Sequence, residues 1–446
     1  MKHSVKRLLA LVLSCALLSV CAFAADFTGR ADELHALGLF KGTGTDEAGN
    51  PVYNLDAAPT RAEAVTMLVR LLGKDAEALE GDWDVPFTDL DGADAWALPY
   101  VGYAYANKLT TGETDTLFGT NNRCSAQMYC TFVLRSLGYS DAEGADFTYA
   151  SALEFATEKG LLDEYLAQGD FLRDEIAAVS YSALLTPLKD SETLLINKLV
   201  EDGAVEADAA KLLTDKLALY NEFNALSAGS SEGADSIDMS MKMDMTMSMG
   251  GVQVPMNMEG SQKVKVTETG IELASVMTIT ALEQTQTLEQ YLKDGVMYTN
   301  DGENKVKAPY TSADDALATL SPSDLSEAAS SPLYFIESIS KAEADGKVSY
   351  TIVLPGNLLT SMTETVIGSM GQAEGLDSMS IGNITMVATF ENDALSSITM
   401  DMPMSVTAEG QTVDVAAKIE MTINAMGDGV VIEFPADLDT YVEAAE

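Results

Sequence analysis

Basic residues are scarce in this chain. Its 446 residues include 26 Lys and Arg against 69 Asp and Glu, which gives a formal net charge of −43. A chain this acidic repels other polyanions, so its composition argues against nucleic acid and anionic membrane surfaces as general partners. Any anionic ligand would need a local basic pocket.

Histidine is rarer still, with two residues in the chain. His3 lies in the N-terminal segment considered below, so a Ser-His-Asp or Cys-His catalytic arrangement would have to use His35. The neighbours of His35 are typical of an ordinary helix, and we expect a solvated or capping role for it. A histidine-based zinc site is excluded by count, and neither a Walker loop nor a Gly-x-Gly-x-x-Gly fingerprint occurs. We therefore expect a protein that is not an enzyme and holds no cofactor and no metal.

Acidic residues are so abundant that carboxylate chemistry stays open. A hydrolase using paired carboxylates is compatible with this composition, but nothing marks a particular pair among the 69 acids. The densest group is Asp82, Asp84, Asp89, Asp91 and Asp94, which lacks the spacing of an EF-hand. We interpret this group as a solvated acidic loop rather than a calcium site.

Long apolar runs are confined to the N-terminal segment. Basic residues precede an apolar run over 8–20, and Ala22-Phe23-Ala24 is a small-x-small cleavage site. These features predict a secretory signal peptide over 1–24. No later stretch reaches the roughly 18 apolar residues of a membrane span. We therefore expect a secreted protein that is not an integral membrane protein.

Cysteine is also sparse. Of four residues, Cys15 and Cys21 fall in the signal peptide, where lipidation of either one is an alternative to simple cleavage. Cys124 and Cys130 remain, and on one helix their Cα atoms would lie about 9 Å apart, beyond the roughly 7 Å limit for a disulfide. Two small buried thiols are therefore favoured over a bridge.

An internal repeat organises the first half of the chain. Residues 66–73 read Thr-Met-Leu-Val-Arg-Leu-Leu-Gly, and residues 131–138 read Thr-Phe-Val-Leu-Arg-Ser-Leu-Gly. Each segment closes the second helix of a helix–loop–helix unit, and its glycine suits a helix C-terminus. A weaker third copy runs from about 146 to 188. A unit of this kind cannot bury its apolar face alone, so the copies must pack on one another.

The repeat resembles the S-layer homology (SLH) family. Phe87-Thr88-Asp89-Leu90 looks like that family's opening motif, and Thr60-Arg61-Ala62-Glu63 looks like the signature at the start of its second helix. The resemblance covers roughly 25–189. It implies three all-α helical repeats, which we place at 25–78, 79–140 and 141–190, and non-covalent attachment to an acidic secondary cell-wall polysaccharide.

Two copies keep the residues that the resemblance assigns to polysaccharide binding. Arg61 and Glu63 in the first copy are matched by Arg173 and Glu175 in the third, whereas the second copy reads Ser-Ala-Gln-Met at 125–128. A cation in the first turn of a helix opposes the helix dipole, so Arg61 calls for another reason. A guanidinium suits carboxylate or ketal-pyruvate groups. Glu63 equally fits a capping box with the preceding threonine.

The pattern changes after a helical spacer over 191–226 and a flexible linker over 227–236. Methionine then occupies every second position, which puts six side chains on one face of a strand. They are Met239, Met241, Met243, Met245, Met247 and Met249. Further strands follow, with helices expected at about 313–320, 333–344 and 358–370. We predict an α+β domain over 237–446, with a long curved antiparallel sheet and helices on one side.

This second half resembles the LolA/LppX-like group of secreted proteins in its plan. The likeness rests on long paired strands and on the strand-turn-strand at 291–298, and no short motif supports it. In that group an incomplete barrel holds a lipid or acyl chain, so the resemblance implies a hydrophobic ligand. The methionine face suits varied apolar shapes, while ordinary core packing explains the same face.

Together these features predict a multidomain protein secreted to the cell wall or cell surface. Its SLH-like repeats would anchor it to the polysaccharide, and its β-rich domain would present a binding face. The alternative is an extracytoplasmic carrier or chaperone for lipids or other hydrophobic ligands, with the repeats serving only for location. A lipid and another surface protein are further candidate partners.

Overall fold

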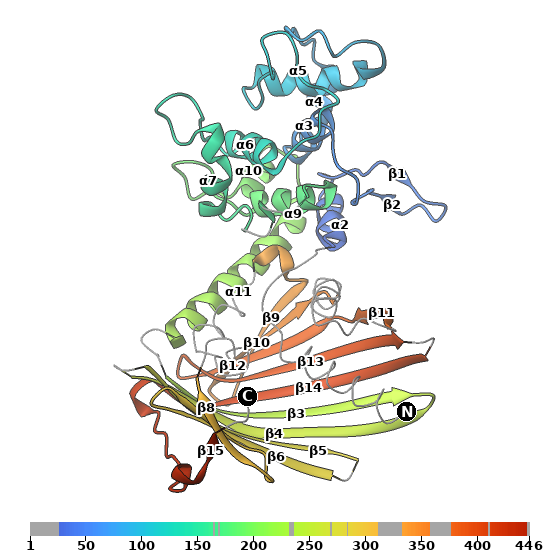
Figure 1. The fold of residues 1–446 in the computed structure, drawn as a ribbon. Coiled ribbons are helices and arrows are strands. Elements are labelled where there is room, and N and C mark those ends of the chain that lie inside the picture. Colours follow the sequence, from blue (N-terminus) through green and yellow to red (C-terminus); the bar gives the residue numbers. More distant parts are fainter. Residues whose placement is uncertain are drawn as a thin grey trace. The chain divides into compact units, whose positions relative to one another are not determined.

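The computed structural model describes residues 26–163, 166–167, 170–231, 236–267, 270–282, 284–310, 332–356, 376–408 and 411–443. These residues fall into two compact units. One comprises Ala25–Ala218 with Pro332–Tyr334, and the other comprises Leu219–Ser331 with Phe335–Glu446. Figure 1 labels the elements of both, and each unit is described by itself below.

The first unit is built mainly of helices. They are α2 (Thr28–Ala36), α3 (Arg61–Leu71), α4 (Asp75–Glu80), η1 (Gly92–Ala97), α5 (Leu98–Ala106), α6 (Ala126–Ser136), η2 (Tyr149–Ser151), α7 (Ala152–Glu158), α9 (Arg173–Leu184), α10 (Leu195–Glu201) and the start of α11 (Ala207–Ser231). It is not purely helical, because β1 (Gly44–Thr45) and β2 (Pro51–Val52) form a two-stranded ladder in its first long loop.

Three helices form the centre of this unit. α3, α6 and α9 contact one another. Each also packs against the first helix of a different predicted repeat: α3 against α5, α6 against α7, and α9 against α2. The pairing therefore closes on itself, with the last helix returning to the first. This closure lets helix–loop–helix units bury one another's apolar faces. The number of S-layer homology repeats, and the boundaries assigned to them, stay predictions.

The second unit is dominated by one sheet of thirteen strands among the described residues. The strands are β3 (Ile237–Met249), β4 (Val252–Thr267), β5 (Gly270–Ala281), β6 (Gln284–Lys293), β7 (Val296–Asn300), β8 (Lys305–Pro309), β9 (Ser338–Ala344), β10 (Lys347–Leu354), β11 (Leu376–Ile381), β12 (Ile384–Glu391), β13 (Ala394–Ala408), β14 (Gln411–Met426) and β15 (Val442–Glu443).

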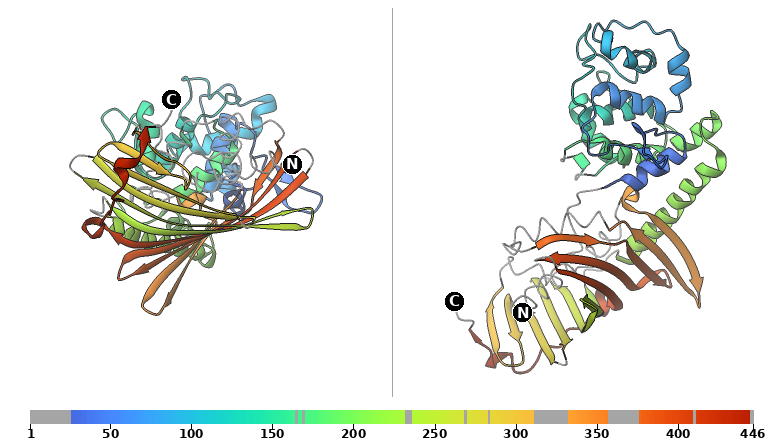
Figure 2. Two further views of the ribbon diagram at one scale, coloured as in Figure 1. Left: turned by 60° about the horizontal axis from the view of Figure 1, so that its bottom comes forward. Right: turned by 90° about the vertical axis from the view of Figure 1, so that its right-hand side faces the viewer.

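The order of these strands brings the two ends of the domain together. It runs β15-β8-β7-β6-β5-β4-β3-β14-β13-β12-β10-β9, with β11 paired to the far end of β13. Every pair is antiparallel except β15 with β8, so the sheet is mixed. β3 and β14 lie side by side in its middle, and the strands rotate progressively across it (Figure 2). The predicted long sheet is confirmed, while its curvature stays a prediction.

Two-residue turns close several of the hairpins. Positive φ at both turn residues occurs at 250–251, 294–295, 345–346 and 392–393. This is the conformation that type I′ hairpin turns require, and Gly, Asn and Asp supply it at low cost. These turns fix the register of the long strands, and with it the face that each side chain takes.

Two expectations about this half differ from the structure. The helix predicted at 333–344 is wrong: a short η4 (Leu333–Phe335) is followed by β9, which pairs with β10 across the Asp345-Gly346 turn. Helix-favouring Ala, Glu and Lys were outweighed by this hairpin. The predicted linker begins inside a helix, because α11 continues to Ser231 and the Ser230 hydroxyl donates to Leu226 O. The helices expected at 313–320 and 358–370 lie outside the described residues.

Candidate functional site

The predicted binding residues Arg61 and Glu63 begin helix α3. Thr60 caps this helix: its Oγ1 accepts a hydrogen bond from Glu63 N at 3.2 Å, and Glu63 Oε2 accepts one from Thr60 N at 2.8 Å. The capping box read from the sequence is therefore present. In the third copy Leu172 has no side-chain acceptor, but Glu175 Oε2 still accepts a bond from Leu172 N at 2.7 Å. Both glutamates thus have a structural role at a helix start.

Arg61 is buried with unusual partners. The side chain is 6% exposed, and its guanidinium lies 4.8 Å and 5.2 Å from the ring centroids of Phe118 and Phe132. One Nη donates to Thr111 O at 2.6 Å, while Nε has no hydrogen-bond partner. None of the carboxylates in the described ranges lies within ion-pair distance of it. Burial lowers the pKa of Arg61, as expected for a desolvated cation.

Arg173 differs from Arg61 although the sequence motif matches. It is 7% exposed, its Nε donates to Tyr53 O at 3.1 Å, and its Nη1 lies 3.6 Å from Glu63 Oε1. Burial lowers the pKa of Arg173, while Glu63 acts in the opposite direction. The structure therefore brings together Glu63 and Arg173, from two different predicted repeats, and pairs their charges.

The first turns of α3 and α9 make the same kind of contact. Arg61 N and Ala62 N donate to Asn122 O and Thr120 O, at 2.8 and 3.2 Å. Arg173 N and Asp174 N donate in the corresponding way to Ala57 O and Leu55 O, at 3.0 and 3.1 Å. Loops from other parts of the chain thus satisfy N–H groups that a helix start leaves free. An anion at these positions would have to be bound by the side chains.

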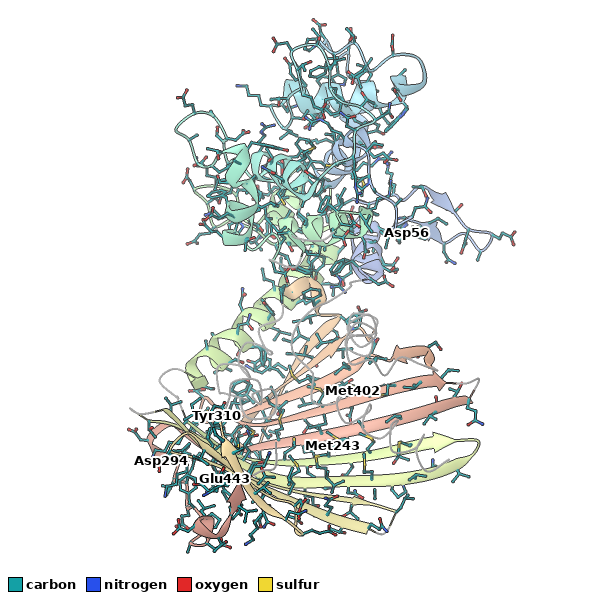
Figure 3. All side chains as sticks on the ribbon, in the orientation of Figure 1. Asp56, Met243, Asp294, Tyr310, Met402 and Glu443 are labelled. Carbon is teal, nitrogen blue, oxygen red and sulfur yellow. The ribbon has the colours of Figure 1, made fainter. Side chains whose placement is uncertain are left out.

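A cavity of about 470 Å³ lies beside the start of α9. Its lining is rich in carboxylates and consists of Asp26, Thr28, Tyr53, Asn54, Leu55, Asp56, Leu172, Asp174 and Glu175. Asp56 lies at the end of the loop that carries β1 and β2 (Figure 3). Burial raises the pKa of Asp174 to about 8 and also raises that of Glu175. Both oxygens of Asp174 accept from Phe27 N, at 2.9 and 3.0 Å. No motif or spacing in the sequence points to this buried acid.

Asp89, in the Phe-Thr-Asp-Leu motif, holds a loop in place. It accepts backbone hydrogen bonds from Phe118, Gly119 and Thr120 at 2.8, 2.8 and 3.1 Å. Burial by itself would raise the pKa of this carboxyl, but the three N–H donors outweigh it and the pKa is lowered. Since Phe118 packs against Arg61, the motif positions one wall of the Arg61 environment.

The remaining polar candidates have ordinary partners. His35 is exposed, as one of its two expected roles requires, and its Nδ1 lies 2.8 Å from Phe40 O in the loop after α2. Cys124 and Cys130 are buried and free, as predicted, and burial raises the pKa of both thiols, that of Cys124 to about 12. Within the described ranges, no three His, Cys, Asp or Glu side chains are grouped to hold a metal ion.

The methionines of β3 lie on one face, as their spacing predicts. Met239, Met243, Met245 and Met247 are buried and Met241 is partly buried, whereas the side chain of Met249 lies outside the described residues. Met239 belongs to a second cluster, while other strands extend the apolar cluster of Met241, Met243, Met245 and Met247 with Met256, Met258, Met277, Met400, Met402 and Met404. Met243 and Met402 mark its positions on β3 and β13 (Figure 3). The same alternation at 256–258 and 400–404 could have revealed these residues in the sequence.

The described residues thus form a mainly helical unit and a separate unit built on one large sheet. Residues 86–125 match the family profile of the S-layer homology domain, so this chain carries an S-layer homology segment, as its motifs predicted. Residues 223–440 match a family described as "Family of unknown function (DUF6612)". The described residues contain no helix with the length and apolar character needed to cross a membrane.

Two similar proteins are named as bacterial surface proteins. The chain is 26% identical to a cell surface protein of Thermoanaerobacter kivui over 195 residues, which cover 43% of this chain and 24% of that protein. It is 31% identical to the middle cell wall protein of Brevibacillus brevis over 115 residues, which cover 26% of this chain and 10% of that protein. The chain therefore spans about a quarter or less of these relatives.

Among solved structures, two resemble the expected LolA/LppX-like plan. LprF from Mycobacterium bovis aligns with 48% of this chain and 98% of its own, at 14% identity and a TM-score of 0.25. A LolA superfamily protein from Nitrosomonas europaea aligns with 49% of this chain and 97% of its own, at 7% identity and a TM-score of 0.18. These low scores leave the likeness without weight for function.

Proposed function

We propose that this chain is a non-enzymatic cell-surface protein whose helical unit attaches it, without a covalent bond, to an acidic polysaccharide of the cell wall. The observation that carries the proposal is the match of residues 86–125 to the S-layer homology domain. The relatives named as cell surface and cell wall proteins support the same location. The signal-peptide pattern at 1–24 is in keeping with export.

Arg61 is the residue that we propose to bind an anionic group of the polymer. It is a cation without a carboxylate partner among the described residues, and its buried Nε–H has no hydrogen-bond partner. A guanidinium carries five N–H donors, so it keeps capacity for a carboxylate or a ketal-linked pyruvate after bonding to Thr111. The desolvated surroundings strengthen any such charge-assisted bond.

Glu63, Arg173 and Glu175 have a different part in this proposal. Arg173 is already paired with Glu63, and the cavity beside it is lined by four carboxylates. A polyanion gains little from a cation whose charge is compensated. These three residues would therefore shape the surface on which the polymer lies, while Arg61 pairs with an anionic group of the polymer.

The test compares matched arginine variants of chain 25–446 in co-sedimentation with purified cell-wall sacculi. Arg61→Met should weaken binding by about tenfold or more, the loss of one charge-assisted contact, and Arg61→Lys should restore part of it. Arg173→Met should weaken binding less, and Arg123→Ala, at an exposed arginine, should leave it unchanged. Arg61→Met protein that is folded by tryptophan fluorescence yet pellets like the wild type would refute the role of Arg61.

A second candidate function concerns the sheet unit. We infer that a hydrophobic ligand, such as an acyl chain, could be carried on the methionine face, because flexible thioether side chains from five strands belong to one apolar cluster. Binding of a fluorescent fatty acid to chain 25–446 tests this. Met277→Asp, at the partly buried margin, should abolish binding, and Thr278→Asp on the other face should not. Absence of binding by the wild type would eliminate the candidate.

A further inference from the structure

Four methionines form a rectangle at the centre of the sheet. The register places Met243 opposite Met258 and Met245 opposite Met256, on the neighbouring strands β3 and β4. All four point to the same face and are only 1–2% exposed. Strand neighbours lie about 4.8 Å apart, and alternate residues of one strand lie about 6.7 Å apart. Four flexible thioethers of this spacing can converge on one point.

Small residues beside the rectangle leave room for the sulfur atoms of further methionines. Gly260 follows Met258 on the same face of β4, and a Cβ there would stand 3.0 Å from the Sδ of Met277. The thioether of Met277, from β5, thus occupies the space that the glycine leaves open. On the other side, Ala417 is paired with Met245 and in turn with Met402 of β13. A glycine inside a strand often marks a close approach of another group.

Apolar packing alone does not select methionine at these positions. A buried methionine loses more side-chain freedom than leucine or isoleucine, and β-branched residues are better suited to strands. Methionine also specifies a packed core poorly, because it has three rotatable bonds. What it offers in exchange is a polarizable sulfur with a lone pair. Adjacent methionines on two strands therefore favour a role for the sulfur atoms.

We propose that Met243, Met245, Met256 and Met258 form a binding site for a soft monovalent metal ion, Cu(I), held through their thioether sulfurs. Thioethers select Cu(I), whereas Ca²⁺, Mg²⁺ and Zn²⁺ require oxygen, nitrogen or thiolate ligands. The ligands are neutral, so the site suits a singly charged ion. The net charge of −43 gives the whole chain a field that attracts cations. Binding involves no change in the oxidation state of the metal.

The absence of titrating ligands gives the site a distinctive signature. Sites built from cysteine, histidine or carboxylate lose metal as the pH falls, because protons compete for the ligand. A thioether does not take up a proton in this range. Cu(I) bound by the rectangle should therefore remain bound, with an affinity unchanged within about threefold, between pH 7 and pH 5.

The experiment measures Cu(I), kept reduced with ascorbate, by competition with a chromophoric chelator, and Ag(I) as a redox-stable substitute. All proteins are chain 25–446 with Cys124→Ala and Cys130→Ala, since these thiols also bind Cu(I). The parent should bind one ion in the rectangle. Changing Met243, Met245, Met256 and Met258 to leucine should weaken binding at least a hundredfold. A control with leucine at Met67, Met128, Met297 and Met426 should bind like the parent.

Leucine keeps the face apolar and about the same size, so a loss of folding can be separated from a loss of metal binding. Far-UV circular dichroism should show the same sheet in all three proteins. Co-sedimentation with sacculi, which depends on the helical unit, should be alike in all three, so failure of this proposal is distinguishable from failure of the proposed attachment. Equal Cu(I) binding by the parent and the rectangle variant, no binding by the parent, or binding lost at pH 5 would each overturn the proposal.

Discussion

At the scale of single residues, buried charge decides what each arginine can do. Arg61 and Arg173 are almost equally buried, at 6% and 7% exposure. Arg173 has a carboxylate from a neighbouring helix start, whereas Arg61 has two aromatic rings, one backbone carbonyl and the Thr110 hydroxyl. A buried cation without a counter-ion is costly. An anionic ligand at Arg61 would relieve that cost, and this favours Arg61 over Arg173 as the residue that binds the polymer.

Asp174 predicts how the helical unit responds to pH. Burial raises the pKa of this carboxyl from 3.8 to about 8, so the folded state holds the proton more tightly than the unfolded state. The stabilisation is fully present below the unfolded pKa and is lost as the pH rises toward 8. Asp174→Asn, which keeps an acceptor for Phe27 N, should raise the stability at pH 8 by about 1 kcal/mol or more and remove most of the pH dependence.

Tryptophan fluorescence measures this effect, because both tryptophans of the chain, Trp83 and Trp96, belong to the helical unit. Urea unfolding at pH 5 and pH 8 gives the comparison for wild type and variant. If the wild type were more stable at pH 8 than at pH 5 and Asp174→Asn made no difference, the buried carboxyl would not be the titrating group.

Asp89 predicts a second effect at this scale. Three backbone N–H groups depend on its carboxylate, so Asp89→Ala should lower the free energy of unfolding of the helical unit by about 2–3 kcal/mol. The exposed neighbour Asp91→Ala should change it by less than about 0.5 kcal/mol. Urea unfolding followed by tryptophan fluorescence measures both. Equal effects would mean that the acidic loop acts only through its overall charge.

At the scale of elements, strand periodicity and turn residues carried most of the predictable information. Alternating methionines predicted the face of β3, and the helix start at Thr60 followed from the capping motif. The composition of the segment 333–344 favours a helix, whereas the Asp345-Gly346 turn makes most of it a strand. Arg61 contacts Thr111, 50 residues away, and Arg173 contacts Tyr53, 120 residues away. Contacts of this length follow from packing and not from local sequence.

Gly260 offers a test of how tightly the sheet face is packed. A Cβ at this position would meet Val276 O at 2.6 Å and Met277 Sδ at 3.0 Å. Backbone cannot move aside cheaply, so Gly260→Ala should destabilise the sheet unit by about 1–3 kcal/mol. Thermal unfolding followed by far-UV circular dichroism measures the loss. Gly44→Ala, where a Cβ meets nothing within 4 Å, is the control and should be neutral. A neutral result for Gly260→Ala would mean that β4 and β5 are less closely packed than described.

At the scale of the whole molecule, net charge determines how attachment to the wall depends on salt. A chain of net charge −43 approaching an acidic polymer is repelled at long range, while the proposed contact at Arg61 acts at short range. The screening length falls from about 30 Å at 0.01 M salt to about 8 Å at 0.15 M. Binding to sacculi should therefore strengthen over this interval. A steep loss of binding instead would point to a broad basic surface, in disagreement with this composition.

The most direct test of the central claim is co-sedimentation of chain 25–446 with two preparations of the same cell-wall sacculi at 0.15 M salt. One preparation keeps its acidic secondary polysaccharide, and the other has had that polymer removed by acid. The proposed attachment predicts that the protein pellets with the first and stays in solution with the second. Equal pelleting with both would contradict the account, because the protein would then be held by peptidoglycan or by nothing specific.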